Sequence, residues 1–179
     1  MPKRSSAKGN ASAPPNPQNS YTNQEVEDYK LDQVTTVIGF DYGARRIGVA
    51  MGNRVSHSAR ALDIVGNGAN GPDWKHVDVL LRDWRPDALL VGLPLTLDSG
   101  EQHNSLAARQ FAAELHRRHK MLVLMVDERL SSREAAHRFA ERRASGALKR
   151  KDAAALDAVA AEIIVEQWLR EDAAKTREP

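Results

Sequence analysis

The sequence predicts an α/β fold in which helices cover both faces of a mixed five-stranded sheet. Two observations support this prediction. Three apolar, β-branched runs with short connections come first, which favours antiparallel strands. Further apolar runs then alternate with segments of helical periodicity, which favours parallel strands joined by helices. Parallel strands of this kind are buried on both faces, so we expect helices on each side of the sheet.

The first three strands are expected close together in the chain. Val34–Asp41 is an almost continuous apolar and β-branched run, which is typical of a buried strand. Ile47–Met51 follows after a short turn, and Ala59–Val65 is the third candidate. The glycine-rich stretch Gly66–Gly71 is expected to be irregular.

Helices and parallel strands are expected to alternate from there on. Apolar residues at i, i+3, i+4 and i+7 predict one helix that begins after Pro72 and ends at Pro86. The same spacing predicts a second helix around Ala108–Leu115. The apolar runs Ala88–Gly92 and Met121–Val126 are predicted to be buried strands.

Two more helices are expected in the last third of the chain. Ser131 and Glu134 form a capping-box pattern at the start of the first of them. A basic loop over residues 143–151 precedes the last helix, which is predicted from about Asp152 to Arg170. Its apolar stripe is predicted to consist of Leu156, Val159, Ala160, Ile163 and Ile164.

The chain is expected to hold one domain, residues 34–171, between two tails. Residues 1–33 are rich in Ser, Ala, Asn and Pro. Such a segment buries too little apolar surface to offset its ordering entropy, so we expect a disordered tail. Residues 172–179 are expected to be a flexible C-terminal tail.

Composition excludes several classes of protein. The 179 residues include no cysteine, which excludes disulfides and thiolate metal sites. No run approaches the roughly 20 apolar residues of a membrane span, and no apolar segment follows the basic N-terminal residues. We therefore expect a cytoplasmic protein without a membrane partner. The net charge of +2 is small, so any interaction with nucleic acid must depend on local basic clusters.

Three acidic positions lie where carboxylates are unusual. Asp41 ends an apolar strand, Glu128 with its neighbour Asp127 follows another, and Asp157 lies just off the apolar stripe of the last helix. Ligand sites gather at the carboxyl ends of parallel strands. Carboxylates that meet there repel one another unless a cation lies between them, and Mg²⁺ prefers oxygen ligands. Two such ions about 4 Å apart can activate water and stabilise the leaving oxygen in phosphodiester hydrolysis.

Each acid also has a simpler interpretation. Asp41 alone is compatible with a turn residue. Asp127 and Glu128 are compatible with an exposed pair beside Arg129. Asp157 suits the first turns of a helix, where acids interact favourably with the helix dipole. Spacing by itself therefore gives the three-acid site modest support.

Histidine and tryptophan give no further site. His116 and His119 have a spacing that zinc ligands can have, but a catalytic zinc site needs three protein ligands and no third follows. Trp74, Trp84 and Trp168 fit core and helix-edge packing. At 5% aromatic residues, the chain offers no stacking platform for single strands.

Four segments in order resemble one family. They are GFDYGARRIGVAMGN (39–53), LLVGLPLTLDSGEQ (89–102), VDERLSS (126–132) and LDAVAAEIIVEQWL (156–169). They resemble the YqgF family, also called RuvX, whose members are described as pre-16S rRNA nucleases or Holliday junction resolvases. The resemblance covers residues 34–171 and implies a ribonuclease H-like fold and a metal-dependent nuclease of the bacterial cytoplasm.

The resemblance also implies which residues form the site. The catalytic and metal-binding acids fall on Asp41, Glu128 and Asp157, with Mg²⁺ or Mn²⁺ as the cofactor. Nucleic-acid binding is expected of basic residues near these acids, because they can contact backbone phosphates. Exposed arginines and solvated basic runs are common, so the alternative for each is an ordinary surface residue. The candidates are Arg45, Arg46, Arg129, Lys149, Arg150 and Lys151.

The expected function is cleavage of nucleic acid, and its substrate stays open. We favour processing of the 5′ end of pre-16S rRNA, with ribosomal particles as further partners. The first alternative is a Holliday junction resolvase, which calls for a two-fold dimer, and the sequence is compatible with a monomer or a homodimer. A second is a non-catalytic nucleic-acid- or ribosome-binding module. DYGARRIGVA also resembles the phosphate loop of actin-like ATPases, but those need a second subdomain that this chain is too short to hold.

Overall fold

The structure is a computed structural model that describes residues 31–93, 99–127 and 153–175. A six-stranded sheet has the order β4-β3-β2-β1-β5-β6. Its strands are β1 (Thr36–Tyr42), β2 (Arg46–Asn53), β3 (Ser58–Gly68), β4 (Gly71–Pro72), β5 (Ala88–Leu93) and β6 (Leu122–Asp127). The helical elements are η1 (Leu31–Gln33), α2 (Trp74–Trp84), α3 (Ser99–His119) and α5 (Ala153–Lys175).

The sheet is mixed, as predicted. β1, β2, β3 and β4 pair antiparallel in chain order, whereas β1, β5 and β6 are parallel neighbours. The predicted count of five strands is wrong by one. The irregular loop predicted at Gly66–Gly71 is instead a hairpin, in which Asn67 pairs with Pro72 and Gly68 with Gly71. A two-residue edge strand has no periodicity to detect, and an edge position tolerates proline.

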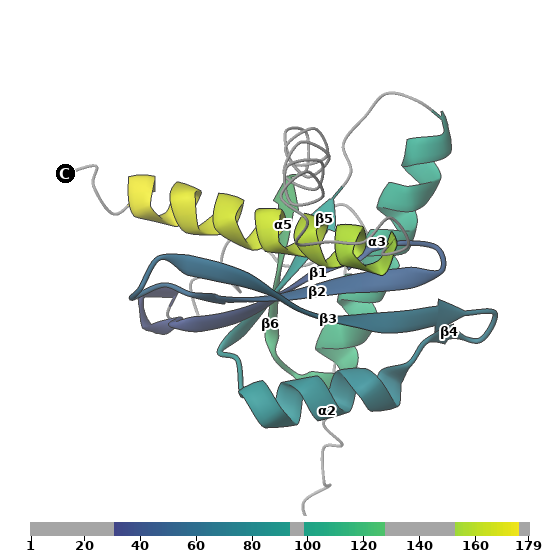
Figure 1. Ribbon diagram of the computed structural model, residues 1–179, viewed down its shortest axis with the longest axis horizontal. Helices are drawn as coiled ribbons and strands as arrows, with labels where there is room; N and C mark the ends of the chain where they lie inside the picture. The colour runs from purple at the N-terminus through teal and green to yellow at the C-terminus, as the bar shows by residue number, and fades with distance from the viewer. Residues whose placement is uncertain (1–30, 94–98, 128–152, 176–179) are drawn as a thin grey trace, which may run out of the picture.

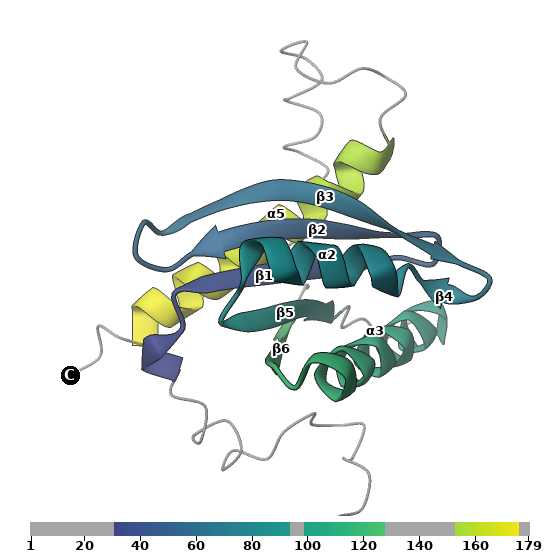
Figure 2. The same ribbon diagram turned by 90° about the horizontal axis from the view of Figure 1, so that it is seen from below.

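Helices cover both faces of the sheet, which confirms the prediction of a covered sheet. α5 crosses one face, and α2 and α3 lie on the other (Figures 1 and 2). α2 begins at the predicted place, where the Asp73 side chain accepts a hydrogen bond from the His76 amide at 3.2 Å. It ends with Arg85 in the left-handed region, directly before Pro86.

Aromatic residues join α2 and α3 to the sheet. The Phe111 ring on α3 lies 5.5 Å from that of Phe40 and 5.1 Å from that of Tyr42. It also stacks on Trp74 of α2 at 5.6 Å. The tryptophans of the described ranges pack at the edge of the core, as expected. Because Phe40 and Tyr42 face these two helices, the alternation of the strand turns Asp41 to the α5 face.

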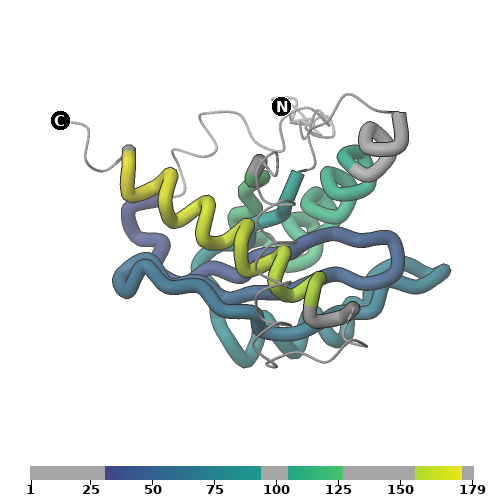
Figure 3. The backbone as a smooth tube through the Cα atoms, turned by 45° about the horizontal axis from the view of Figure 1, so that its top comes forward, coloured from purple at the N-terminus to yellow at the C-terminus, as the bar shows by residue number. Residues whose placement is uncertain are grey.

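α5 lies close to the sheet because strand glycines leave room for it. A Cβ atom on Gly39 or Gly52 would overlap the Val165 side chain, and one on Gly48 would overlap the carbonyl oxygen of Asp157. Figure 3 shows α5 running obliquely over the strands. Three glycines on two neighbouring strands therefore set the height of the helix above the sheet.

The predicted apolar stripe of α5 is only partly right. The residues that join the main core are Ala161, Ile164, Val165 and Leu169. Val159 and Ile163 are buried too, but in a separate cluster with Ala160. The sheet-facing row therefore continues back to Asp157 in steps of four, and Asp157 lies on this row rather than beside it. Because α5 is apolar on more than one side, periodicity could not select the correct face.

Arg54 ties both ends of the described chain to β2. Its Nε donates a hydrogen bond to Asp172 Oδ2 at 2.5 Å, and its guanidinium donates another to the Leu31 carbonyl at 2.8 Å. α5 continues to Lys175, beyond its predicted end at Arg170. These contacts hold η1 and the last turns of α5 at one end of the sheet.

Some predictions concern residues outside the described ranges. These are residues 1–30 of the predicted disordered tail 1–33, the helix that begins at Ser131 and the basic loop over 143–151. The last three residues of that predicted tail instead form η1, and residues 172–175 of the predicted flexible C-terminal tail belong to α5. Within the three described ranges, no helix is both long enough and apolar enough to cross a membrane.

Candidate active site

The parallel strands bring Asp41 and Asp127 to the same end of the sheet. Asp41 is the second-last residue of β1, and Asp127 ends β6, where it pairs with Leu93 of β5. The carboxyl ends of β1, β5 and β6 share this edge because the three strands are parallel. Glu128 is bonded to Asp127 but lies outside the described residues, so its predicted role stays a prediction.

Asp157 reaches this edge from the other end of the sequence. Gly48 pairs directly with Asp41 across the antiparallel β1–β2 ladder. The Asp157 backbone packs on Gly48 so closely that a methyl group there would overlap its carbonyl oxygen. One glycine thus seats the start of α5 on the strand residue opposite Asp41. The structure therefore brings together two of the three predicted acids.

The charge of Asp157 affects the Asp41 carboxyl group. The pKa of Asp41 is raised from 3.8 to about 6, first by burial and then by the negative charge of Asp157. Burial removes water that would stabilise the carboxylate, and a like charge nearby disfavours ionisation further. A cation at this position would reverse both effects, because it favours the ionised carboxylates.

Arg46 contacts the second acid directly. Its Nε donates a hydrogen bond to Asp157 Oδ2 at 2.8 Å, and the two side chains are 44% and 27% exposed. Arg45, the preceding residue, is exposed and has no carboxylate partner among the residues that the structure describes. The predicted nucleic-acid residues thus lie close to Asp41, with Arg45 in the turn and Arg46 at the start of β2, but Arg46 interacts with an acid.

Asn67 fixes the turn that carries these arginines, which the sequence did not indicate. Its side chain is buried, and Nδ2 donates a hydrogen bond to the Gly43 carbonyl at 2.8 Å. Its backbone amide donates to the Arg45 carbonyl at 2.9 Å. A further turn hydrogen bond runs from the Gly43 amide to the Arg46 carbonyl at 3.1 Å. Asn67 lies more than twenty residues along the chain, so no local pattern predicts the contact.

The donor set suits a hard divalent cation. Asp41 and Asp157 supply carboxylate oxygens, which Mg²⁺ and Mn²⁺ prefer, and their mutual repulsion is what a cation would relieve. In the described ranges, no group of three His, Cys, Asp or Glu residues is arranged to hold a metal. The third predicted ligand, Glu128, falls outside those ranges, as do Arg129 and Lys149–Lys151.

The histidines serve packing instead. His116 Nδ1 lies 2.8 Å from the Met121 carbonyl, beyond the end of α3. His119 Nε2 lies 3.6 Å from Asp78 of α2, and burial lowers the pKa of His119. The two rings thus interact with different parts of the chain.

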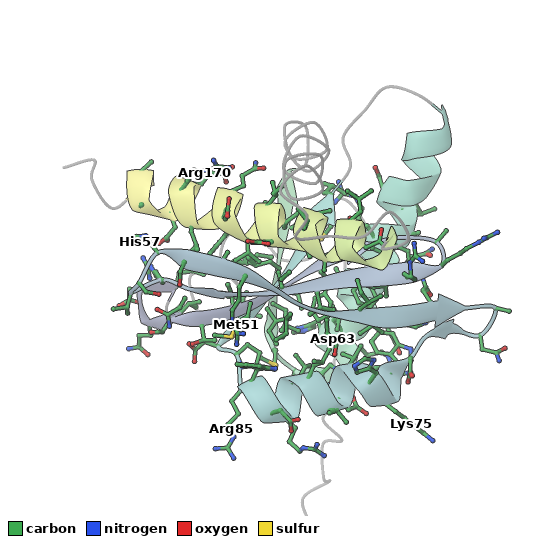
Figure 4. All side chains as sticks on the ribbon, viewed as in Figure 1. Met51, His57, Asp63, Lys75, Arg85 and Arg170 are labelled. Carbon is green, nitrogen blue, oxygen red and sulfur yellow. The ribbon has the colours of Figure 1, made fainter. Side chains whose placement is uncertain are left out.

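A cleft of about 400 Å³ lies away from the two acids. It is formed by the β2–β3 hairpin and the second half of α5, and its lining includes His57, Glu166 and Arg170. His57 and Arg170 both lie towards the C-terminal end of α5 (Figure 4). Asp157 is near the opposite end of that helix, so the cleft is separate from the acid pair.

This sheet, with one acid near the end of β1 and another on the helix that crosses it, defines a ribonuclease H-like α/β domain. The sequence carries the assignment further. The RuvX family, described as "Holliday junction resolvase", matches residues 35–171, and the chain belongs to this family. A relative from Xanthomonas axonopodis pv. citri named "Putative pre-16S rRNA nuclease" is 52% identical over 134 residues, 75% of this chain and 86% of the relative.

Solved structures show weaker likenesses. The chain is similar to T. thermophilus RuvC in complex with a Holliday junction substrate, with 17% identity, a TM-score of 0.49 and coverage of 77% of this chain and 96% of that one. The yeast mitochondrial Holliday junction resolvase Ydc2 has 12% identity and a TM-score of 0.44, with 86% and 87% covered. Family membership rests on the sequence match alone.

Proposed function

We propose that this protein is a nuclease that hydrolyses phosphodiester bonds with a divalent cation held by Asp41, Glu128 and Asp157. The observation that carries the proposal is the placement of Asp157 over Gly48, directly across the β1–β2 ladder from Asp41. Two like charges that meet beside a buried sheet cost free energy unless a cation lies between them. Membership of the RuvX family supports nuclease chemistry with such a cation.

The residues of the site have separate tasks. Asp41 and Asp157 hold the cation from the strand side and the helix side, and Glu128, after the end of β6, is the third ligand. When bound, Mg²⁺ or Mn²⁺ would activate water and stabilise charge on the phosphodiester. Arg45, exposed in the adjacent turn, binds a backbone phosphate. Arg129 and the basic cluster Lys149–Lys151 bind further phosphates along the nucleic-acid backbone.

The substrate that we favour is precursor ribosomal RNA, cut at the 5′ end of 16S rRNA in the cytoplasm. The name of the 52% identical relative supports this choice. Ribosomal particles would then be the setting in which the protein meets its substrate.

A four-way DNA junction is the second candidate, because the family description names it. Symmetric cleavage of a junction requires two active sites related by a two-fold axis, so this candidate requires a homodimer. The mass of the protein on the junction, measured by light scattering, separates a dimer from a monomer.

Cleavage by purified protein tests both candidates side by side. A precursor 16S 5′-leader RNA and a four-way DNA junction would each be incubated with Mg²⁺ or Mn²⁺. The control is the triple variant Asp41→Asn, Glu128→Gln, Asp157→Asn, which exposes a contaminating nuclease. If the wild-type protein cuts one substrate and the triple variant does not, the result supports the proposed nuclease activity and identifies its substrate. If folded protein cuts neither, the proposal is wrong and a binding role takes its place.

A further inference from the structure

We propose that Arg46 and the divalent cation compete for the same Asp157 carboxylate, so that loading the metal releases Arg46 towards the substrate. The inference rests on the proposed metal site. It assigns to Arg46 a task that differs from that of Arg45, although the two are adjacent arginines in one turn.

Arg46 occupies a carboxylate oxygen of Asp157 that a cation would need. Arg46 Nε lies 2.8 Å from Asp157 Oδ2, which is a charge-assisted hydrogen bond to one of the oxygens that a cation would need. Asp157 itself is seated by its backbone on Gly48, so the carboxylate cannot move far from Asp41. A cation that takes this carboxylate therefore meets Arg46 there.

The exposure of Arg46 allows it to leave Asp157 when a cation binds. The Arg46 side chain is 44% exposed, so it can leave Asp157 without crossing packed residues. Ion pairs exposed to this degree contribute little free energy, so the pair is weak enough for a divalent cation to displace. The released guanidinium remains tied to the site through the turn that Asn67 holds by its hydrogen bonds to Gly43 and Arg45. It then lies where an incoming phosphate would bind.

The pair also has an electrostatic role. Asp157 raises the pKa of Asp41 by repulsion, and the positive charge of Arg46 beside Asp157 limits that repulsion. Arg46 thus serves as a counter-ion for Asp157, and the cation takes over this role. Arg45 offers a matched control, because it has the same charge in the same turn and no ion pair within the described ranges.

Calorimetric titration of the full-length protein with Mg²⁺ or Mn²⁺, without nucleic acid, tests the competition. Arg46→Ala should bind the ion about three- to fivefold more tightly than Arg45→Ala, because only Arg46→Ala removes a competitor. Equal affinities of these two variants, or weaker binding by Arg46→Ala, would overturn the inference. Thermal unfolding of both variants establishes that they are folded.

A Asp157→Asn variant separates this inference from the proposed function. If wild type binds no metal, or if Asp157→Asn binds it as wild type does, the metal site itself is wrong. If Asp157→Asn loses binding while the two arginine variants agree, only the competition is wrong.

Nuclear magnetic resonance gives a direct readout of the release. In protein labelled with ¹⁵N-arginine, the Nε–H resonance of Arg46 is identified as the one missing from Arg46→Ala. Saturating Mg²⁺ should move it towards its position in Asp157→Ala, where no side-chain oxygen accepts from Arg46 Nε. A resonance that stays in place while calorimetry shows Mg²⁺ bound would contradict the proposal.

Discussion

The Asp41 carboxyl group lies in surroundings that favour its protonated form. Burial and the charge of Asp157 raise its pKa from 3.8 to about 6. The folded protein therefore binds a proton more tightly there than the unfolded chain does. Stability from this group is present below the unfolded pKa and is lost as the pH rises towards about 6. Without a cation, ionised Asp41 destabilises the fold.

An Asp41→Asn variant should therefore be more stable than wild type above about pH 6, by up to about 3 kcal/mol, since one pKa unit corresponds to about 1.4 kcal/mol. Urea unfolding of both proteins over a pH series, with chelator present, measures the difference. It should be small below about pH 4 and grow between the two pKa values. A constant difference across the series would show that the amide acts through packing rather than through charge.

Asn67 holds the turn between β1 and β2 through its side-chain hydrogen bond to Gly43. Asn67→Ala leaves the Gly43 carbonyl without its side-chain donor, which should cost about 1–3 kcal/mol. Hydrogen exchange of the amides from Gly43 to Arg46 should accelerate relative to the amides of β1. Asn70→Ala is the matched control, because Asn70 is exposed in the same hairpin. Equal exchange in the two variants would show that Asn67 does not hold the turn.

At the scale of elements, the contact between α5 and β2 determines whether the two acids meet. Gly48→Ala would place a methyl group against the Asp157 carbonyl, which belongs to backbone and cannot rotate away. We expect a loss of about 1–3 kcal/mol from this overpacking, and a loss of metal binding because Asp157 is displaced from Asp41. Gly66→Ala, where a Cβ meets open space, is the control. Urea unfolding and calorimetry measure the two effects, and unchanged metal binding would contradict this account of the site.

The elements were largely predictable because their signals are local. Apolar runs and helical spacing predicted the main strands and helices, since burial of one face or stripe leaves a period in the sequence. β4 escaped prediction because two residues hold no period. The face of α5 was only partly predicted because its apolar residues extend around the helix.

The candidate residues of the site were predictable from the sequence, whereas the contacts between them were not. Asp41 and Asp157 were found because a family motif lies around each, and the structure brings them together. The Arg46–Asp157 pair joins residues 111 positions apart. Gly48 matters because the absence of a Cβ atom leaves room for the Asp157 backbone. Contacts of this kind depend on how helix and sheet pack in three dimensions, so no pattern along the chain predicts them.

At the scale of the whole molecule, Arg54 links η1, β2 and the end of α5. Its Nε–Asp172 hydrogen bond is partly buried, so its loss should cost about 1–2 kcal/mol. Arg54→Ala, Asp172→Ala and the double variant form a cycle that isolates the pair in urea unfolding. Because the Arg54–Leu31 bond remains in Asp172→Ala, Arg54→Ala should be the more destabilising of the two. Additive losses in the cycle would show that the pair contributes nothing.

The contact between the Asp157 backbone and Gly48 also has a consequence for the synthesis of the protein on the ribosome. A ribosome makes β1 and β2 early, and α5 follows after every other strand and helix described above. Until α5 has left the ribosome and docked, Asp41 has no Asp157 beside it. In the proposed metal site, a growing chain would therefore lack one cation ligand until α5 has docked. The order of synthesis would then make the docking of α5 the step that completes the site.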